Sequence, residues 1–168
     1  AKQHNLKEMS RTLVFLQENK IGSIEEMQER VDAATARYHE LGDSIKASEM
    51  RLAEIAVLKA HIINYAKTRP AYDAYRKTGY SKRFLETHRT EITLHKAAKA
   101  AFDEANLKTL PKAKELDAEY FKLLTEKKAR YPDYRKAKEE MQELLRAQKN
   151  IELFFDEEKN PKQTEHSR

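Results

Sequence analysis

The feature that most constrains the fold is a long apolar repeat in the first third of the chain. From residue 24 to residue 55, residues recur at alternating spacings of three and four, and Ser48 is the single polar member of the series: Ile24, Met27, Val31, Ala34, Tyr38, Leu41, Ile45, Ser48, Leu52 and Ile55. A heptad pattern sustained over this length is typical of a helix that packs along another helix. Gly42 lies off the series, so we expect it to cost about 1 kcal/mol relative to alanine without ending the helix.

A second stretch, near the C-terminus, has the same spacing and supplies a partner for the first. Its members are Ala113, Leu116, Tyr120 and Leu123, then Tyr134, Ala137, Met141, Leu144, Gln148, Ile151 and Phe155. The chain has no Trp, only three Gly and four Pro, and a charged fraction of 36%. This composition is typical of long helices rather than of a thick spherical core.

The predicted fold class is therefore all-α: a long antiparallel coiled-coil hairpin with a small helical tip and a short N-terminal helix. The predicted segments are the N-terminal helix at the open end in 1–22, the first arm in 23–76, the helical basic tip in 77–110, the second arm in 111–155, and a disordered tail in 156–168. Pro70 is expected to kink the first arm or to start a new segment.

This hairpin also implies a register. If the arms leave the tip near residues 77 and 110, the numbers of facing residues sum to about 187, which pairs Val31 with Phe155. The slip in the apolar series after Ile55 would then lie opposite the irregular stretch at Tyr131 and Pro132. The N-terminal helix would cover the open end of the hairpin, with its apolar residues near Phe154.

Positive charge is concentrated in the middle of the chain. The net charge is +5, yet residues 67–99 contain nine Lys and Arg against only Asp73, Glu86 and Glu91, so this segment carries +6 and the remainder −1. The nine basic residues are Lys67, Arg69, Arg76, Lys77, Lys82, Arg83, Arg89, Lys96 and Lys99. Such an imbalance informs about binding partners rather than about the fold.

The basic segment surrounds Gly79, where the first arm is predicted to end, and it predicts contact with nucleic-acid phosphates. Two other interpretations remain open, a merely solvated tip and an acidic protein partner. Tyr65, Tyr72 and Tyr75 continue the apolar series and are expected in the core, whereas Tyr80 lies beyond it and could stack on an unpaired base. The candidate nucleic-acid-binding residues are Arg76, Lys77, Tyr80, Lys82, Arg83, Arg89 and Lys96.

Catalytic and metal-binding patterns are not predicted. The chain has no Gly-rich phosphate loop and no Cys, which excludes thiolate zinc sites and disulfides. His88, Glu91 and His95 share one helical face, but Phe84 and Phe102 extend the same line, which favours a packed face over a metal site. We therefore expect no catalytic residue, metal or cofactor. No stretch is apolar enough for a transmembrane helix, so no membrane insertion is expected.

Five phrases of this sequence resemble the C-terminal region of relaxases, the mobilisation nucleases of conjugative and mobilisable elements in Gram-positive bacteria. They are "NLKEMSRTLVFLQENKIGS", "AEIAVLKAHIINYAKTR", "AYRKTGYSKRF", "EITLHKAAKAAFDE" and "YRKAKEEMQELL". The likeness covers most of residues 5–155, and its mid-chain phrases are the most specific. It implies a parent enzyme that nicks DNA through a tyrosine and a histidine-bound metal in an N-terminal nuclease domain.

None of those catalytic motifs matches a position of this chain, which is expected to be a piece of a longer protein. The resemblance implies a helical extension that holds DNA or docks other transfer proteins in the cytoplasm. The predicted function is thus a non-catalytic DNA-binding and scaffolding module that contacts the DNA backbone through its tip. The alternative is a coiled-coil arm for docking or homodimer formation without nucleic-acid contact.

Overall fold

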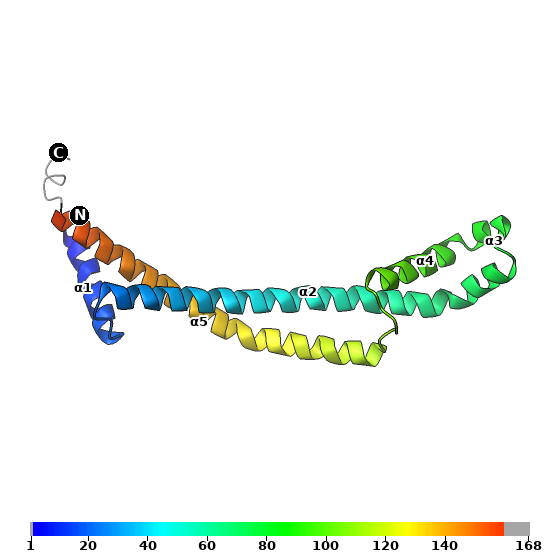
Figure 1. Ribbon diagram of the computed structural model, residues 1–168, viewed down its shortest axis with the longest axis horizontal. Coiled ribbons are helices and arrows are strands. Elements are labelled where there is room, and N and C mark those ends of the chain that lie inside the picture. The colour runs from blue at the N-terminus through cyan, green and yellow to red at the C-terminus, as the bar shows by residue number, and fades with distance from the viewer. Residues whose placement is uncertain (1, 160–168) are drawn as a thin grey trace. The chain divides into compact units, whose positions relative to one another are not determined.

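The chain is all-α, as predicted. The computed structural model describes residues 2–159, and within them it contains five helices and no strand (Figure 1). The helices are α1 (Lys2–Glu18), α2 (Ile24–Lys77), α3 (Lys82–Thr87), α4 (Arg89–Glu104) and α5 (Ala113–Lys159). None of these helices combines the length and the apolar character needed to cross a membrane.

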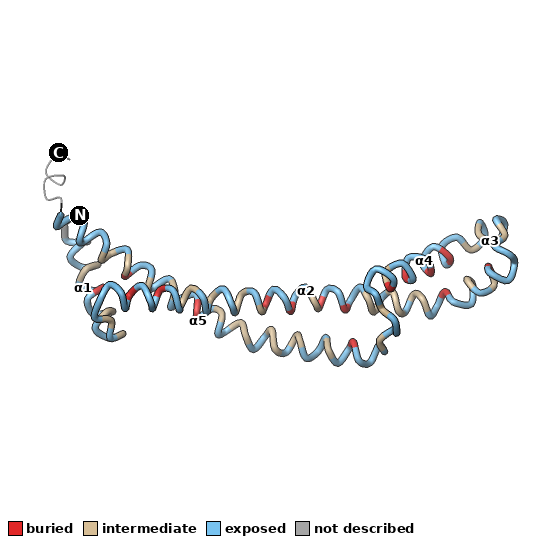
Figure 2. Tube along the Cα trace, viewed as in Figure 1, coloured by how far each residue is buried: buried red, intermediate tan, exposed pale blue. Residues whose placement is uncertain are grey.

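The chain divides into two compact units, and both long helices contribute to each. Unit 1 comprises residues 1–45 and 129–168, and unit 2 comprises residues 46–128. In both units α2 and α5 run antiparallel, in agreement with the predicted hairpin. Figure 2 shows that buried positions recur at regular intervals along α2 and that α4 has a buried face of its own.

In unit 1 the core lies where α1 meets the paired ends of α2 and α5. Met27, Val31 and Ala147 form the buried cluster. The partly buried side chains that pack against it are Phe15, Leu16, Ile21, Leu144 and Ile151. Asn150 Nδ2 donates to Thr12 Oγ1 over 3.1 Å, which ties the middle of α1 to α5.

The pairing of α2 with α5 in unit 1 differs from the predicted register. The rings of Tyr38 and Tyr134 stack with centroids 5.1 Å apart and their hydroxyls lie 3.0 Å apart. Gln148 Nε2 donates to Gln28 Oε1 over 2.8 Å. These pairs sum to 172 and 176, so the sum of 187 is wrong, and Val31 packs with Ala147 rather than with Phe155.

In unit 2 the reason for this error is visible. Three ion pairs join α2 to α5 in this unit: Arg51 with Glu119, Lys59 with Asp117, and Glu49 with Lys127. They reach only to residue 59 of α2, because α4 folds back and packs on the following turns of α2 instead. The predicted register pairs those turns with the second arm. Ile55 belongs to unit 2 and Tyr131 to unit 1.

The predicted apolar series is confirmed in α2 and only partly confirmed in α5. Between Met27 and Ile55 every member of the series in α2 is buried or half-buried, whereas Ile24 is 61% exposed. In the first turns of α5, Leu116 is buried, but Tyr120 is 39% exposed. Pro70 lies inside α2, so no new segment begins there.

The predicted tail begins too early. Helix α5 continues to Lys159, so residues 156–159 are helical, and residues 160–168 of the predicted disordered tail lie outside the described residues.

Candidate functional site

The candidate site in unit 2 is organised by the turn that ends α2. The backbone N–H of Tyr80 donates to Tyr75 O over 3.2 Å, and that of Gly79 donates to Arg76 O over 3.0 Å. This pair of bonds is the Schellman motif, and it needs a left-handed residue, which Gly79 supplies with φ 68°. Ser81 then caps α3, since its Oγ accepts from the N–H of Phe84 over 3.4 Å. Gly79 therefore ends α2, as the sequence predicts, and Ser81 begins α3.

Aromatic rings connect this turn to α3 and α4. Tyr75 is 6% exposed, and it contacts the Phe84 ring at 6.2 Å and the Tyr80 ring at 5.3 Å, edge to face. The Lys96 ammonium of α4 lies 5.8 Å from the centre of the Tyr75 ring, in a cation–π contact. Tyr75 is therefore a core residue, as predicted, and it brings Tyr80 and Lys96 to one place.

His95 occupies the centre of the α2–α4 contact. It is 3% exposed, and its ring stacks between Tyr65 and Tyr72 with centroids 4.4 Å away on either side. Thr68 Oγ1 donates to Asn64 O over 2.6 Å, so it can only accept at its 3.0 Å contact with His95 Nδ1. Nδ1 of His95 therefore carries a proton and donates it to Thr68 Oγ1.

The surroundings of His95 favour a neutral imidazole. Burial lowers the pKa of His95 from its usual value of 6.5, and the charges of Lys99 and Arg69 lower it further. Asp73 acts in the opposite direction and raises the pKa, as does the Tyr65 backbone. His95 thus acts as a buried packing residue at neutral pH.

The other two members of the His88, Glu91 and His95 series do not join His95. The His88 ring stacks on Phe84 at 4.1 Å with Nδ1 3.2 Å from Phe84 O, and Glu91 is exposed. In the described part of the chain, no three His, Asp or Glu side chains are grouped so that they could hold a metal ion. The packed-face interpretation is confirmed for His88 and His95.

The predicted nucleic-acid-binding residues are all exposed, and they come from three successive helices and from the turn between the first two. The end of α2 carries Arg76 and Lys77, the turn carries Tyr80, α3 carries Lys82 and Arg83, and α4 carries Arg89 and Lys96. Lys96 and Tyr80 both contact the Tyr75 ring. The other candidate residues have no hydrogen bond, ion pair or ring contact with one another in the described structure. Arg69, Asp73, Arg76 and Lys77 line a shallow open depression on α2. Arg69 is not among the candidate residues predicted from the sequence, although its spacing of seven from Arg76 puts both on one helix face.

Positive charge in this segment is hardly neutralised from within. All nine basic residues of 67–99 are exposed, and among the described residues only Arg69 has an ion-pair partner, Asp73 at 3.9 Å. In the α2–α5 part of unit 2, by contrast, Arg51, Lys59 and Lys127 each pair with an acid. The hydrogen bond between Arg51 and Glu119 stabilises both charged forms, since it raises the pKa of Arg51 and lowers that of Glu119.

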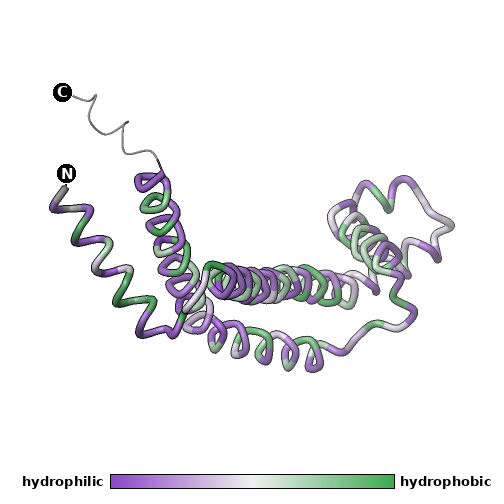
Figure 3. The backbone as a smooth tube through the Cα atoms, turned by 60° about the vertical axis from the view of Figure 1, so that its left-hand side comes forward, coloured by the Kyte–Doolittle hydropathy of each residue, from purple (hydrophilic) through white to green (hydrophobic). Residues whose placement is uncertain are grey.

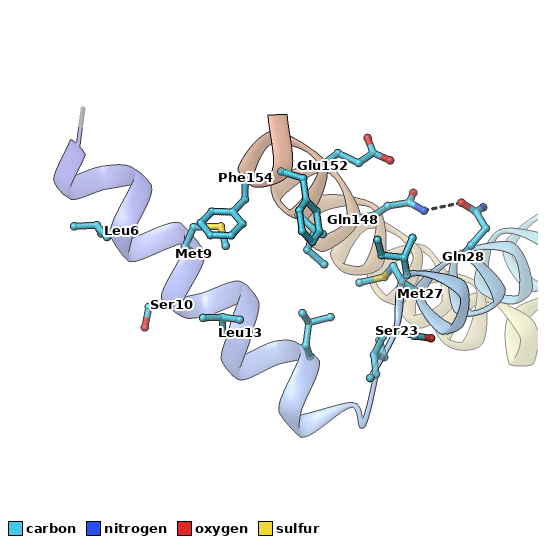
Figure 4. Close-up of a pocket in the computed structure, with 16 residues that line it drawn as sticks. Leu6, Met9, Ser10, Leu13, Ser23, Met27, Gln28, Gln148, Glu152 and Phe154 are labelled. Carbon is cyan, nitrogen blue, oxygen red and sulfur yellow. Dashed lines mark hydrogen bonds between the residues drawn. The ribbon is translucent and has the colours of Figure 1, made fainter. Parts of the chain in front are cut away.

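Unit 1 has a different surface feature, an apolar groove of about 640 Å³ between α1, the start of α2 and the end of α5. Figure 4 shows Leu6, Met9 and Leu13 of α1 on one side of it and Phe154 of α5 on the other. Leu6 is 71% and Leu13 60% exposed. Figure 3 shows hydrophobic positions recurring along both α1 and α5. The sequence predicts the N-terminal helix near Phe154 at this end, but no sequence pattern indicates that the space between α1 and Phe154 is open.

Comparisons with protein-family models, with curated proteins and with solved structures found no match for this chain.

Proposed function

We propose that this chain is a non-catalytic DNA-binding and scaffolding module that holds the DNA backbone through the basic segment of unit 2. The observation that carries the proposal is the exposure of nine basic side chains, of which one has an ion-pair partner in the described structure. Free cations on one segment release counterions from a nucleic-acid backbone when they bind it, and this release provides affinity without reading sequence. The resemblance to the C-terminal region of relaxases adds a context, DNA mobilisation in the cytoplasm with other transfer proteins as further partners.

Charge reversal tests the proposal directly. A variant with Arg76→Glu, Lys77→Glu, Lys82→Glu and Arg83→Glu should lose most of its affinity for labelled DNA, measured by fluorescence anisotropy at low salt. The matched control reverses four exposed basic residues of unit 1, which changes the net charge of the protein equally: Arg37→Glu, Arg135→Glu, Lys138→Glu and Lys149→Glu. This control should bind nearly as tightly as the wild type. Equal losses in both variants would show a general charge effect and would contradict a site in unit 2.

A second candidate function, self-association as a docking arm, is favoured by the apolar groove of unit 1. Exposed Leu6 and Leu13 line this groove, and a second copy of the chain would present the same apolar face to it. Sedimentation velocity at increasing protein concentration tests this function. A dimer that disappears with Leu13→Glu, in a chain without affinity for DNA, would favour the docking arm and contradict the DNA-binding module.

A further inference from the structure

Within residues 2–159, three helices end in the same hydrogen-bonded turn, and one of these three ends exposes an aromatic ring. At the end of α1, Ile21 N–H donates to Leu16 O over 2.9 Å, and at the end of α4, Leu107 N–H donates to Phe102 O over 3.1 Å. The corresponding bond at the end of α2 runs from Tyr80 to Tyr75. The Schellman motif is commonly completed by an apolar contact between these two residues.

An aliphatic side chain is sufficient for this contact. Ile21 and Leu107 are both half-buried, as expected for residues whose role is to cover the helix end. Tyr80 is instead 57% exposed. Its ring touches Tyr75 edge to face, and Tyr75 is the only ring in contact with it in the described residues. Much of the Tyr80 ring is therefore free for a ligand.

The backbone at Tyr80 is unusual as well. Its φ is 63°, a left-handed value that an L-residue other than Gly, Asn or Asp rarely adopts. At the ends of α1 and α4, the left-handed residue is instead the one before the residue that corresponds to Tyr80: Lys20 precedes Ile21, and Asn106 precedes Leu107. The chain thus holds a tyrosine in a strained conformation at an exposed turn, and such outliers concentrate at functional positions.

The charges around Tyr80 identify the kind of ligand. Arg76, Lys77, Lys82 and Arg83 lie within four residues of it, and all four are exposed. Cationic side chains beside an exposed ring are the combination with which proteins bind single-stranded nucleic acid, because phosphates pair with the cations while a base stacks on the ring. A base inside a duplex does not offer its face.

We propose that Tyr80 is a stacking platform for an unpaired nucleobase, so that the tip binds single-stranded nucleic acid more tightly than duplex. This inference rests on the proposed function, because it assigns the class of nucleic acid to the same basic segment. Stacking tolerates any base and either sugar, so oligothymidylate and oligouridylate should both bind.

The test compares full-length variants on matched oligonucleotides of about 12 nucleotides. Tyr80→Leu supplies the aliphatic residue used at the two other helix ends and removes the ring, while Tyr80→Phe keeps the ring. The probes are oligothymidylate, oligouridylate, a duplex, and an abasic strand with the same phosphates but no bases. Thermal melting of each variant checks that the fold is retained.

Tyr80→Leu should weaken binding of oligothymidylate and oligouridylate at least about fivefold and leave the abasic strand and the duplex unchanged. Tyr80→Phe should bind like the wild type. If Tyr80→Leu binds every probe as the wild type does, the stacking platform is wrong while backbone binding stands. If the wild type binds none of the probes, the proposed function itself fails, together with this inference.

Discussion

At the scale of single residues, His95 shows that histidine, which often acts in catalysis or metal binding in other proteins, can also be a packing residue. Its ring fills the space between Tyr65 and Tyr72, and its Nδ1–H has an acceptor in Thr68. A protonated imidazole in this place would lose its hydration and would face Lys99 and Arg69, with Asp73 and the Tyr65 backbone to compensate in part. The α2–α4 contact should therefore depend on His95 remaining neutral.

This leads to a prediction about pH. The folded-state pKa of His95 is below the unfolded value of 6.5, so the stability that it contributes is complete above pH 6.5 and is lost as the pH falls through the lower folded-state pKa. His95→Phe keeps a ring between the tyrosines and cannot titrate. Between about pH 7 and about pH 5, the melting temperature should fall more steeply for the wild type than for His95→Phe. Parallel curves would contradict a role of His95, since carboxylates titrate in both proteins.

Gly42 gives a second prediction at this scale. A Cβ atom added to Gly42 would lie 3.3 Å from Tyr134 Cε2, and Tyr134 is held by its stacking and hydroxyl contact with Tyr38. In a Tyr134→Ala background, Gly42→Ala should recover about 1 kcal/mol of helix stability, whereas in the wild type it should gain clearly less. Urea unfolding of the four proteins measures the difference. Equal gains in both backgrounds would show that Tyr134 moves aside freely.

The residues that sequence reasoning assigned correctly are those whose local pattern determines their place. The spacing of Tyr75 predicted its burial, and Gly79 was predicted to end its helix because of its conformational freedom. The close approach of Gly42 to Tyr134 could not be predicted, because it depends on which residue of α5 faces Gly42. The positive φ of Tyr80 likewise has no local signal, since tyrosine does not favour that conformation.

At the scale of helices, the packing of α4 on α2 determines which turns of α2 remain available to pair with α5. The heptad spacing predicted that α2 and α5 pair, but spacing alone does not state where a pairing stops. The face of α4 formed by Ile92, His95, Ala98 and Phe102 is buried, and it takes the last turns of α2 away from α5. A separate tip at 77–110 therefore puts the second arm opposite the wrong turns of α2 in the predicted register.

The weight of this helix–helix contact can be measured with two neighbouring substitutions in α4. Ile92 is 1% exposed, so Ile92→Ala should destabilise the protein by about 2 to 5 kcal/mol through the lost contacts and the cavity left behind. Leu94 is 40% exposed, and Leu94→Ala should cost less than about 1 kcal/mol. Chemical denaturation followed by circular dichroism compares them. Similar costs for both variants would mean that α4 is not packed on α2 as described.

At the scale of the whole molecule, charge is divided unevenly along the chain, with +6 in residues 67–99 and −1 in the rest. The two long helices pair acids with bases across their contact, whereas the basic segment is almost free of acids. This division could be read from the sequence. The exposure of all nine basic residues could not be predicted from the sequence, because long side chains can also lie buried along a neighbouring helix.

The salt dependence of binding should reflect this division. If the six candidate cations all contact phosphates, the slope of log K against log salt for a single strand should approach about −4. Lys96→Gln should make the slope less negative by about 0.7 if Lys96 reaches a phosphate as well as the Tyr75 ring. Titrations at several salt concentrations give both slopes. A slope near zero would contradict phosphate binding altogether.

The return of α4 onto α2 also has a consequence for how the chain acquires its structure. The contact between Thr68 and His95 closes a separation of only 27 residues, whereas the contacts between Tyr38 and Tyr134 and between Thr12 and Asn150 span 96 and 138. Closing a shorter loop costs less chain entropy, and local contacts generally form sooner. We therefore expect the α2–α4 pair to form first during folding. The contacts between α2 and α5 and between α1 and α5 in unit 1 should form later.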